Sequence, residues 1–271
     1  MAKVVVITSG KGGVGKTTST AALGAALAQQ GKKVAVVDFD VGLRNLDLVM
    51  GAERRVVFDL INVAQGDARL HQALIRDKRL QNLYLLPASQ TRDKDALTEE
   101  GVRAVIDELR GKFDFILCDS PAGIERGATL AMRFADIAVV VVNAEVSSVR
   151  DSDRIIGLLD AKTACAEKGE RMEKHLLLTR YDASRAGRGE MLNLDDVLEI
   201  LSIPLIGVVP ESEEVLRASN MGAPVVLHNS VSAPARAYAD AARRLIGEDV
   251  PMNIPSDRKG LLGRLFGRRA A

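Results

Sequence analysis

Lys11 and Lys16 lie five residues apart in the stretch SGKGGVGKTT, which covers residues 9–18. Lys16 and Thr17 complete the pattern G-x4-G-K-[ST], whose glycines let backbone N–H groups turn inward around phosphate oxygens. In this pattern the lysine neutralises the β- and γ-phosphates of a nucleotide, and the threonine hydroxyl is a ligand of Mg²⁺. The residues therefore predict a nucleotide-binding loop that works with magnesium.

A phosphate loop also needs carboxylates near the metal, and aspartates follow two apolar runs of the chain. VAVVDFD contains Asp38 and Asp40, and FDFILCD ends in Asp119. An aspartate at a strand end is often only a turn former or a helix cap. Beside a phosphate loop, we expect Asp119 to belong to the Mg²⁺ shell and Asp40 to lie near the metal and the γ-phosphate.

The pattern of the rest of the chain predicts a sheet that positions these groups. Strands buried on both faces are predicted at seven short apolar runs, 4–8, 34–38, 83–87, 113–119, 136–143, 175–181 and 204–210. Helices are predicted between them, at 16–30, 98–110, 149–166, 194–202 and 233–246. This alternation predicts an α/β fold with a single doubly wound, mostly parallel β-sheet and helices on both faces.

The loop KGGVGKTT, with its early lysine, resembles the deviant Walker A loop of the MinD/ParA family of ATPases. Other segments resemble the MinD branch of this family and follow in the same order, namely DFDVGLRNLDLVMG (38–51), ASQTRDKDALT (88–98), CDSPAGIERGA (118–128), EVSSVRDSDR (145–154), HLLLTRY (175–181) and VLRASNMGAPV (215–225). The likeness runs from residue 2 to about residue 246 and resumes in the tail. It implies a P-loop NTPase that hydrolyses ATP to ADP and phosphate with Mg²⁺.

The resemblance also implies roles for individual residues. Lys11 would reach across a dimer interface to the phosphates bound by a second subunit, which couples ATP occupancy to dimerisation. Together with Lys16, Lys11 would be catalytic, and so would Asp40, which would position or activate the attacking water. Asp119 would hold Mg²⁺ through water. Nucleotide contacts are expected from Lys11, Gly12, Gly13, Val14, Gly15, Lys16, Thr17, Thr18, Arg180 and Tyr181.

The C-terminal tail differs in charge from the body. The chain has 37 Lys and Arg against 36 Asp and Glu, and five of these basic residues lie in the last fourteen positions, which contain no acid. On a helical wheel, four apolar tail residues cover an arc of about 140° with basic residues at its margins. The apolar residues are Leu261, Leu262, Leu265 and Phe266, and the basic ones are Lys259, Arg264 and Arg268. We therefore expect three parts, an ATPase domain (1–247), a flexible linker (248–257) and an amphipathic membrane-targeting tail (258–271).

One tail of this size should bind a membrane only marginally, because ordering it costs most of what its apolar side chains contribute. Two tails on a dimer would gain avidity. The expected partners are therefore a second copy when ATP is bound and an anionic membrane surface. With no signal-peptide region and no apolar stretch near the roughly 20 residues of a span, the expected location is the cytoplasm and, with ATP, the inner face of the cell membrane.

The resemblance implies protein partners as well, a MinC-like division inhibitor and a MinE-like or other topological activator. Asp151 and Asp153, in a helix that Ser147 and Ser148 would cap, are expected to contribute to that surface. The plainer alternative is that these acids stabilise the helix dipole.

The predicted function is an ATP-hydrolysing switch that positions the division septum. The alternative is a ParA-type DNA or cargo partition ATPase, which needs a basic face on the folded body. Without the tail, 32 basic residues stand against 36 acidic ones, so the acidity of the body argues against nucleic acid. An iron–sulfur ATPase would need suitably placed cysteines, whereas Cys118 lies in an apolar run and Cys165 lies outside any such motif.

Overall fold

The computed structural model describes residues 2–90 and 96–255 of the chain. Its centre is one eight-stranded sheet with the order β3-β4-β2-β5-β1-β6-β7-β8. The strands are β1 Lys3–Thr8, β2 Val34–Asp38, β3 Ile75–Arg76, β4 Leu83–Leu86, β5 Phe115–Asp119, β6 Ile137–Asn143, β7 Glu173–Tyr181 and β8 Leu205–Pro210. All neighbouring pairs are parallel except β3 and β4. The predicted doubly wound sheet is confirmed.

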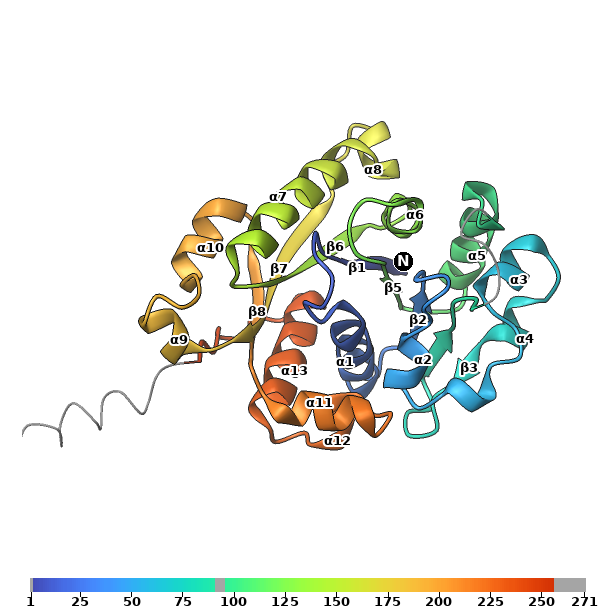
Figure 1. Ribbon diagram of the computed structural model, residues 1–271. Helices are drawn as coiled ribbons and strands as arrows, with labels where there is room; N and C mark the ends of the chain where they lie inside the picture. The colour runs from blue at the N-terminus through green and yellow to red at the C-terminus, as the bar shows by residue number, and fades with distance from the viewer. Residues whose placement is uncertain (1, 91–95, 256–271) are drawn as a thin grey trace, which may run out of the picture.

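Helices cover both faces of this sheet (Figure 1). On one face lie α1 Lys16–Gln29, α2 Leu46–Val49, α11 Glu213–Asn220, α12 Val225–His228 and α13 Ala233–Leu245. On the other lie α3 Leu60–Gln65, α4 Leu70–Ala73, α5 Glu99–Arg110, α6 Arg126–Arg133, α7 Val146–Ala161, α8 Ala164–Glu167, α9 Ala183–Gly187 and α10 Leu194–Leu201. A 3₁₀ turn, Glu53–Arg55, follows α2. Each face buries its own apolar core, which explains why the central strands are apolar at nearly every position except their ends.

The central strands end together at the edge of the sheet where the phosphate loop begins. β1 lies between β5 and β6, and the pairing of β2 with β5 places Asp38 opposite Asp119. In open parallel sheets this carboxyl edge is where ligands bind. Two aspartates that are 81 positions apart in the sequence are therefore neighbours.

The boundaries of α7 differ from the prediction. The helix begins at Val146, three residues early, with Glu145 at its N-cap and no side-chain cap. Ser147 and Ser148 lie within its first turn, so the prediction that they cap the helix was wrong. The helix ends at Ala161, and Cys165 belongs to the separate short helix α8.

Arg244, near the end of α13, holds the segment that follows the domain. Its Nε donates to the carbonyl of Val250 (2.9 Å), and its two terminal nitrogens donate to the carbonyls of Ile206 (2.7 Å) and Pro251 (2.6 Å). The first residues of the predicted linker therefore pack along the edge strand β8. The predicted membrane tail, 258–271, lies outside the described residues, as do positions 91–95 of the ASQTRDKDALT segment.

Within residues 2–90 and 96–255, no helix combines the length and the apolar composition needed to cross a bilayer.

The packing of α1 on β2 yields a stability prediction. A Cβ added at Gly24 would lie 2.6 Å from Cγ1 of Val36, a stiff side chain on the strand. We expect Gly24→Ala to lower the free energy of unfolding by about 1–3 kcal/mol, although alanine is the better helix former. Urea unfolding measures this change.

Gly157, inside α7, is the matched control. A Cβ there meets nothing within 4 Å, so Gly157→Ala should stabilise the protein by about 0.5–1 kcal/mol. Equal effects of the two substitutions would contradict the packing argument.

Candidate active site

Lys16 is buried at the first position of α1, with only 8% of its surface exposed. Its Nζ donates to Ser9 Oγ (2.9 Å), and Ser9 Oγ in turn donates to the carbonyl of Lys11 (2.7 Å). Burial lowers the pKa of Lys16, and the charges of Asp119 and Asp40 oppose this shift. The lysine is therefore fixed before any ligand arrives, with its charge directed at the carboxyl edge of the sheet.

The glycines of the loop leave space where phosphates would lie. Gly13 and Gly15 have φ values of 76° and 98°, in the left-handed region that side chains disfavour. A Cβ at either position would meet no atom within 4 Å. The loop therefore has an open concave side that ends at the N-terminus of α1, the arrangement that binds phosphate oxygens.

Asp119 lies at the end of β5 and faces the start of α1. Its Oδ1 accepts a hydrogen bond from Thr20 Oγ1 (2.9 Å), and Thr17 also donates to this carboxylate. Burial raises the pKa of Asp119 to about 6, while Thr17, Thr20 and Lys16 pull it down. The predicted neighbours Thr17, Lys16 and Asp119 are thus brought together by the structure.

Asp38 and Asp40 have different positions. Asp38 is completely buried, and its carboxylate accepts hydrogen bonds from the backbone N–H of Asp40 (2.9 Å) and of Leu46 (3.2 Å). Burial and the nearby Asp119 raise the pKa of Asp38 well above its ordinary value. Asp40 is only half-buried and lines the cavity described next. Asp38 therefore shapes the turn that presents Asp40.

A cavity of about 700 Å³ opens over the loop, and it contains most of the residues predicted to bind phosphate. Its lining includes Gly12, Gly13, Gly15, Lys16, Thr17, Thr18 and Asp40. Ser120, Pro121 and Glu125 line it from the loop after β5, and Leu48, Val49, Ser219 and Asn220 line it from α2 and α11. A second cavity of about 610 Å³ adjoins it and shares Gly13, Gly15, Thr18, Val49 and Ser219. Together they form a continuous site of a size suited to a nucleotide.

The second cavity separates Arg180 and Tyr181, which were both predicted to contact the nucleotide. Arg180 lines it, in a left-handed conformation (φ 53°), with a terminal nitrogen 3.3 Å from Glu211 Oε1. Tyr181 is buried in the core on the opposite face of the sheet and lines neither cavity. Alternation along β7 accounts for this difference, because successive side chains point to opposite faces.

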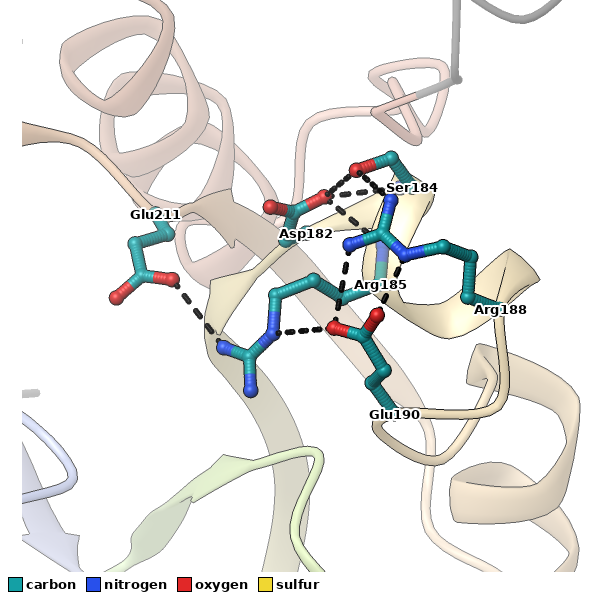
Figure 2. Close-up of polar contacts among 6 residues, drawn as sticks. All are labelled: Asp182, Ser184, Arg185, Arg188, Glu190 and Glu211. Atoms are coloured by element: carbon teal, nitrogen blue, oxygen red, sulfur yellow. Dashed lines mark hydrogen bonds and ion pairs between the residues drawn. The ribbon is translucent and has the colours of Figure 1, made fainter.

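Ion pairs continue outward from the second cavity. Figure 2 shows Glu211 facing Arg185 of α9, with an N–O distance of 3.6 Å, and Arg185 facing Glu190 at 3.5 Å. Sequence reasoning did not single out Glu211 or the α11 residues Leu216 and Ser219, which line the same cavity. Most of α11 lies in the VLRASNMGAPV segment (215–225), which resembles the MinD branch. No motif in that segment, however, indicates contact with a nucleotide base.

Lys11 does not line the phosphate cavity of its own chain. Its Nζ donates to Glu145 Oε2 (2.7 Å) and to Ser147 Oγ (3.0 Å) at the start of α7. The hydrogen bond from Lys11 lowers the pKa of Glu145. The two lysines of the loop therefore point to different places, Lys16 into the site and Lys11 along the surface.

The residues present fit magnesium held largely by substrate phosphates. Mg²⁺ commonly takes one or two protein oxygens and completes its shell with phosphate oxygens and water. Thr17 and Asp40 are oxygen donors that line one cavity, and the buried Asp119 reaches it through its hydrogen bond with Thr17. The described residues contain no cluster of three or more His, Cys, Asp or Glu suited to a metal.

Comparison with known proteins decides the family. The model of the CobQ/CobB/MinD/ParA nucleotide-binding domain matches residues 5–225. The septum site-determining protein MinD of Escherichia coli K12 is 62% identical over 270 residues, which are 98% of this chain and 100% of that protein. The chain belongs to the MinD family. Structures of other members of this family have been solved, and they have the same fold.

Two MinD structures illustrate the likeness. The MinC:MinD complex of Aquifex aeolicus matches with a TM-score of 0.84 and 43% identity, covering 93% of this chain and 99% of that one. MinD of Pyrococcus horikoshii, complexed with Mg-ADP, matches with a TM-score of 0.80 and 33% identity, covering 91% and 97%. The protein is thus a septum site-determining ATPase of the MinD/ParA type, with a nucleotide and Mg²⁺ as cofactors. The predictions of family, fold, activity and cofactors are confirmed.

The buried carboxylate at the site predicts a conflict between stability and activity. Because the pKa of Asp119 rises from 3.8 to about 6 on folding, the folded state holds more protons between these values, and stability falls as pH rises through them. Asp119→Asn removes this cost, so without nucleotide it should raise the free energy of unfolding at pH 7.5 by roughly 2–3 kcal/mol.

The same substitution should abolish magnesium-dependent ATP hydrolysis. Urea unfolding at pH 7.5 and at pH 4.5 tests the stability claim, since the advantage of the variant should shrink at the lower pH. An Asp119→Asn variant that is less stable than the parent at pH 7.5 would contradict it.

Proposed function

We propose that this protein is an ATP-driven switch, in which ATP binding joins two copies, the dimer binds the membrane, and hydrolysis reverses both steps. The position of Lys11 is the observation that supports this proposal most strongly. It lies in the phosphate loop yet outside its own phosphate cavity, with 38% of its side chain exposed. A charge in that position would reach phosphates presented by a second copy once they replace its ion-pair partner Glu145.

Apolar side chains around the cavity support the same arrangement. Leu43 (66% exposed) lines the phosphate cavity. Ile124 (64%) lies two residues after Ala122, which also lines it, and Val146 (55%) precedes Ser147, which accepts a hydrogen bond from Lys11. Large apolar side chains exposed together on one face are typical of an interaction surface. In this proposal, that surface is buried by a second copy of the chain.

Within each subunit, the chain's own residues would divide the chemistry. Lys16 and the loop N–H groups would bind the phosphates, Thr17 and Asp119 would hold the metal, and Asp40 would orient the attacking water. Bound Mg²⁺ would neutralise charge on the phosphate oxygens as the bond breaks. Asp38 would keep the 40–46 turn in place through its two backbone hydrogen bonds. The base would lie in the cavity lined by Arg180 and Leu216.

The proposal extends to protein partners. The Aquifex aeolicus relative is named as part of a MinC:MinD complex, and we infer that this chain recruits a MinC-like inhibitor and responds to a MinE-like activator. Asp153, exposed on α7, is a candidate contact. Asp151 is half-buried, and its backbone packs closely on Gly10. A Cβ added at Gly10 would lie 2.1 Å from the carbonyl carbon of Asp151. A partner that binds α7 would therefore alter the packing of the phosphate loop at Gly10.

Liposome co-sedimentation tests the switch. We expect the full chain to pellet with anionic vesicles when a non-hydrolysable ATP analogue is present and to stay in the supernatant with ADP. The variant 1–257 should not pellet with either nucleotide, because it lacks the amphipathic tail.

Lys11→Ala separates dimerisation from nucleotide binding. This variant should still bind the analogue but remain monomeric in light scattering and fail to pellet. Pelleting that ignores nucleotide would contradict the switch, and retention of DNA in place of vesicles would favour the partition ATPase.

A further inference from the structure

Two short helices form one wall of the nucleotide cavity. Leu48 and Val49 line it from α2, and Ser219 and Asn220 line it from α11. Helices of four and eight residues have little stability of their own and depend on tertiary contacts to keep their positions. The geometry of this wall therefore depends on whatever joins α2 to α11.

The two helices are joined at their C-terminal turns by glycine backbones. Gly51 and Gly222 have φ values of 63° and 62°. A Cβ at Gly51 would lie 2.6 Å from the Gly222 carbonyl oxygen, and a Cβ at Gly222 would lie 2.7 Å from Cα of Gly51. No other residue type fits at this approach without moving one helix away from the other.

One arginine bridges the same two turns. Arg79 donates through one terminal nitrogen to the carbonyl of Gly222 (3.0 Å) and through the other to the carbonyl of Met50 (2.9 Å). The second nitrogen also contacts Asp77 Oδ2 at 2.9 Å, and Asp77 Oδ1 accepts from the backbone N–H of Arg79 (2.7 Å). Asp77 is 4% exposed, and its hydrogen bonds with Arg79 keep its pKa low despite burial. The guanidinium is therefore held in one orientation.

We propose that Arg79 is a positioning residue that latches α2 to α11 and thereby slows the release of bound nucleotide. The latch consists of Arg79, Asp77, Gly51 and Gly222. None of these four residues lines either cavity, so the latch acts on the nucleotide only through the position of the wall. This inference rests on the nucleotide site proposed above.

The latch also links the two ends of the site. α2 directly follows the 40–46 turn that Asp38 anchors, whereas α11 supplies Leu216 to the cavity assigned to the base. Opening the latch frees the base-side wall from the phosphate-side turn. We therefore expect the dissociation rate to respond more than the chemical step.

Stopped-flow release of a fluorescent ADP analogue from the full-length chain with Mg²⁺ tests the proposal. Loss of two charge-assisted hydrogen bonds should make release from Arg79→Ala about tenfold faster. KM for ATP should rise by a similar factor while kcat does not fall. Arg79→Lys keeps the charge but not the two-carbonyl fork, so it should restore release only in part.

Arg54→Ala is the matched control, since that side chain is 94% exposed and contacts only Glu53 at 4.0 Å among the ion pairs of the described residues. Its release rate should equal that of the parent. Lys16→Ala should not bind the analogue at all, and normal binding by that variant would refute the nucleotide site itself. An Arg79→Ala protein with a lower unfolding temperature but an unchanged or slower release rate would overturn the latch and leave Arg79 a purely structural role.

Discussion

The burial of like and unlike charges at one edge of the sheet is the constraint on which the rest of the structure depends. Lys16 is less easily protonated than a free lysine, and Asp119 and Asp38 are less easily ionised than free aspartates. Charges removed from water destabilise a fold unless partners are in place. Here the partners are supplied by separate elements, since β2, β5 and α1 each contribute one group. The cost is offset by the apolar strands behind them, which are buried on both faces.

The same loop places its two lysines in opposite environments. Lys16 begins α1 and is enclosed by Ser9 and the strand ends, whereas Lys11 precedes the left-handed turn at Gly13 and reaches α7. A single short stretch of backbone thus separates a charge that serves its own cavity from one that remains at the surface. The contact with Glu145 keeps that second charge neutralised within the monomer, so any partner that draws on Lys11 must first replace Glu145.

The strands and the phosphate loop were predictable because their signals are local. Continuous Val, Ile and Leu runs are typical of strands that are buried on both faces, and the spacing of Gly10, Gly15, Lys16 and Thr17 indicates phosphate binding. Five features were not predictable. The antiparallel edge strand β3 has two residues, and α2 has four, so neither shows a period. The start of α7 lacks a side-chain cap. The place of Tyr181 depends on the pleat of β7, and the Gly51–Gly222 contact joins turns that are 171 positions apart.

The hydrogen bonds from Arg244 to the carbonyls of Val250 and Pro251 fix these residues beside the domain. They therefore limit how far from the domain the rest of the chain can extend. Only six residues, 252–257, separate this anchor from the amphipathic segment. Six residues span at most roughly 20 Å when fully extended. A predicted tail that begins at residue 258 would therefore start within that distance of Pro251. In the membrane switch proposed above, so short a connection would keep the folded domain close to the surface that the predicted tail binds.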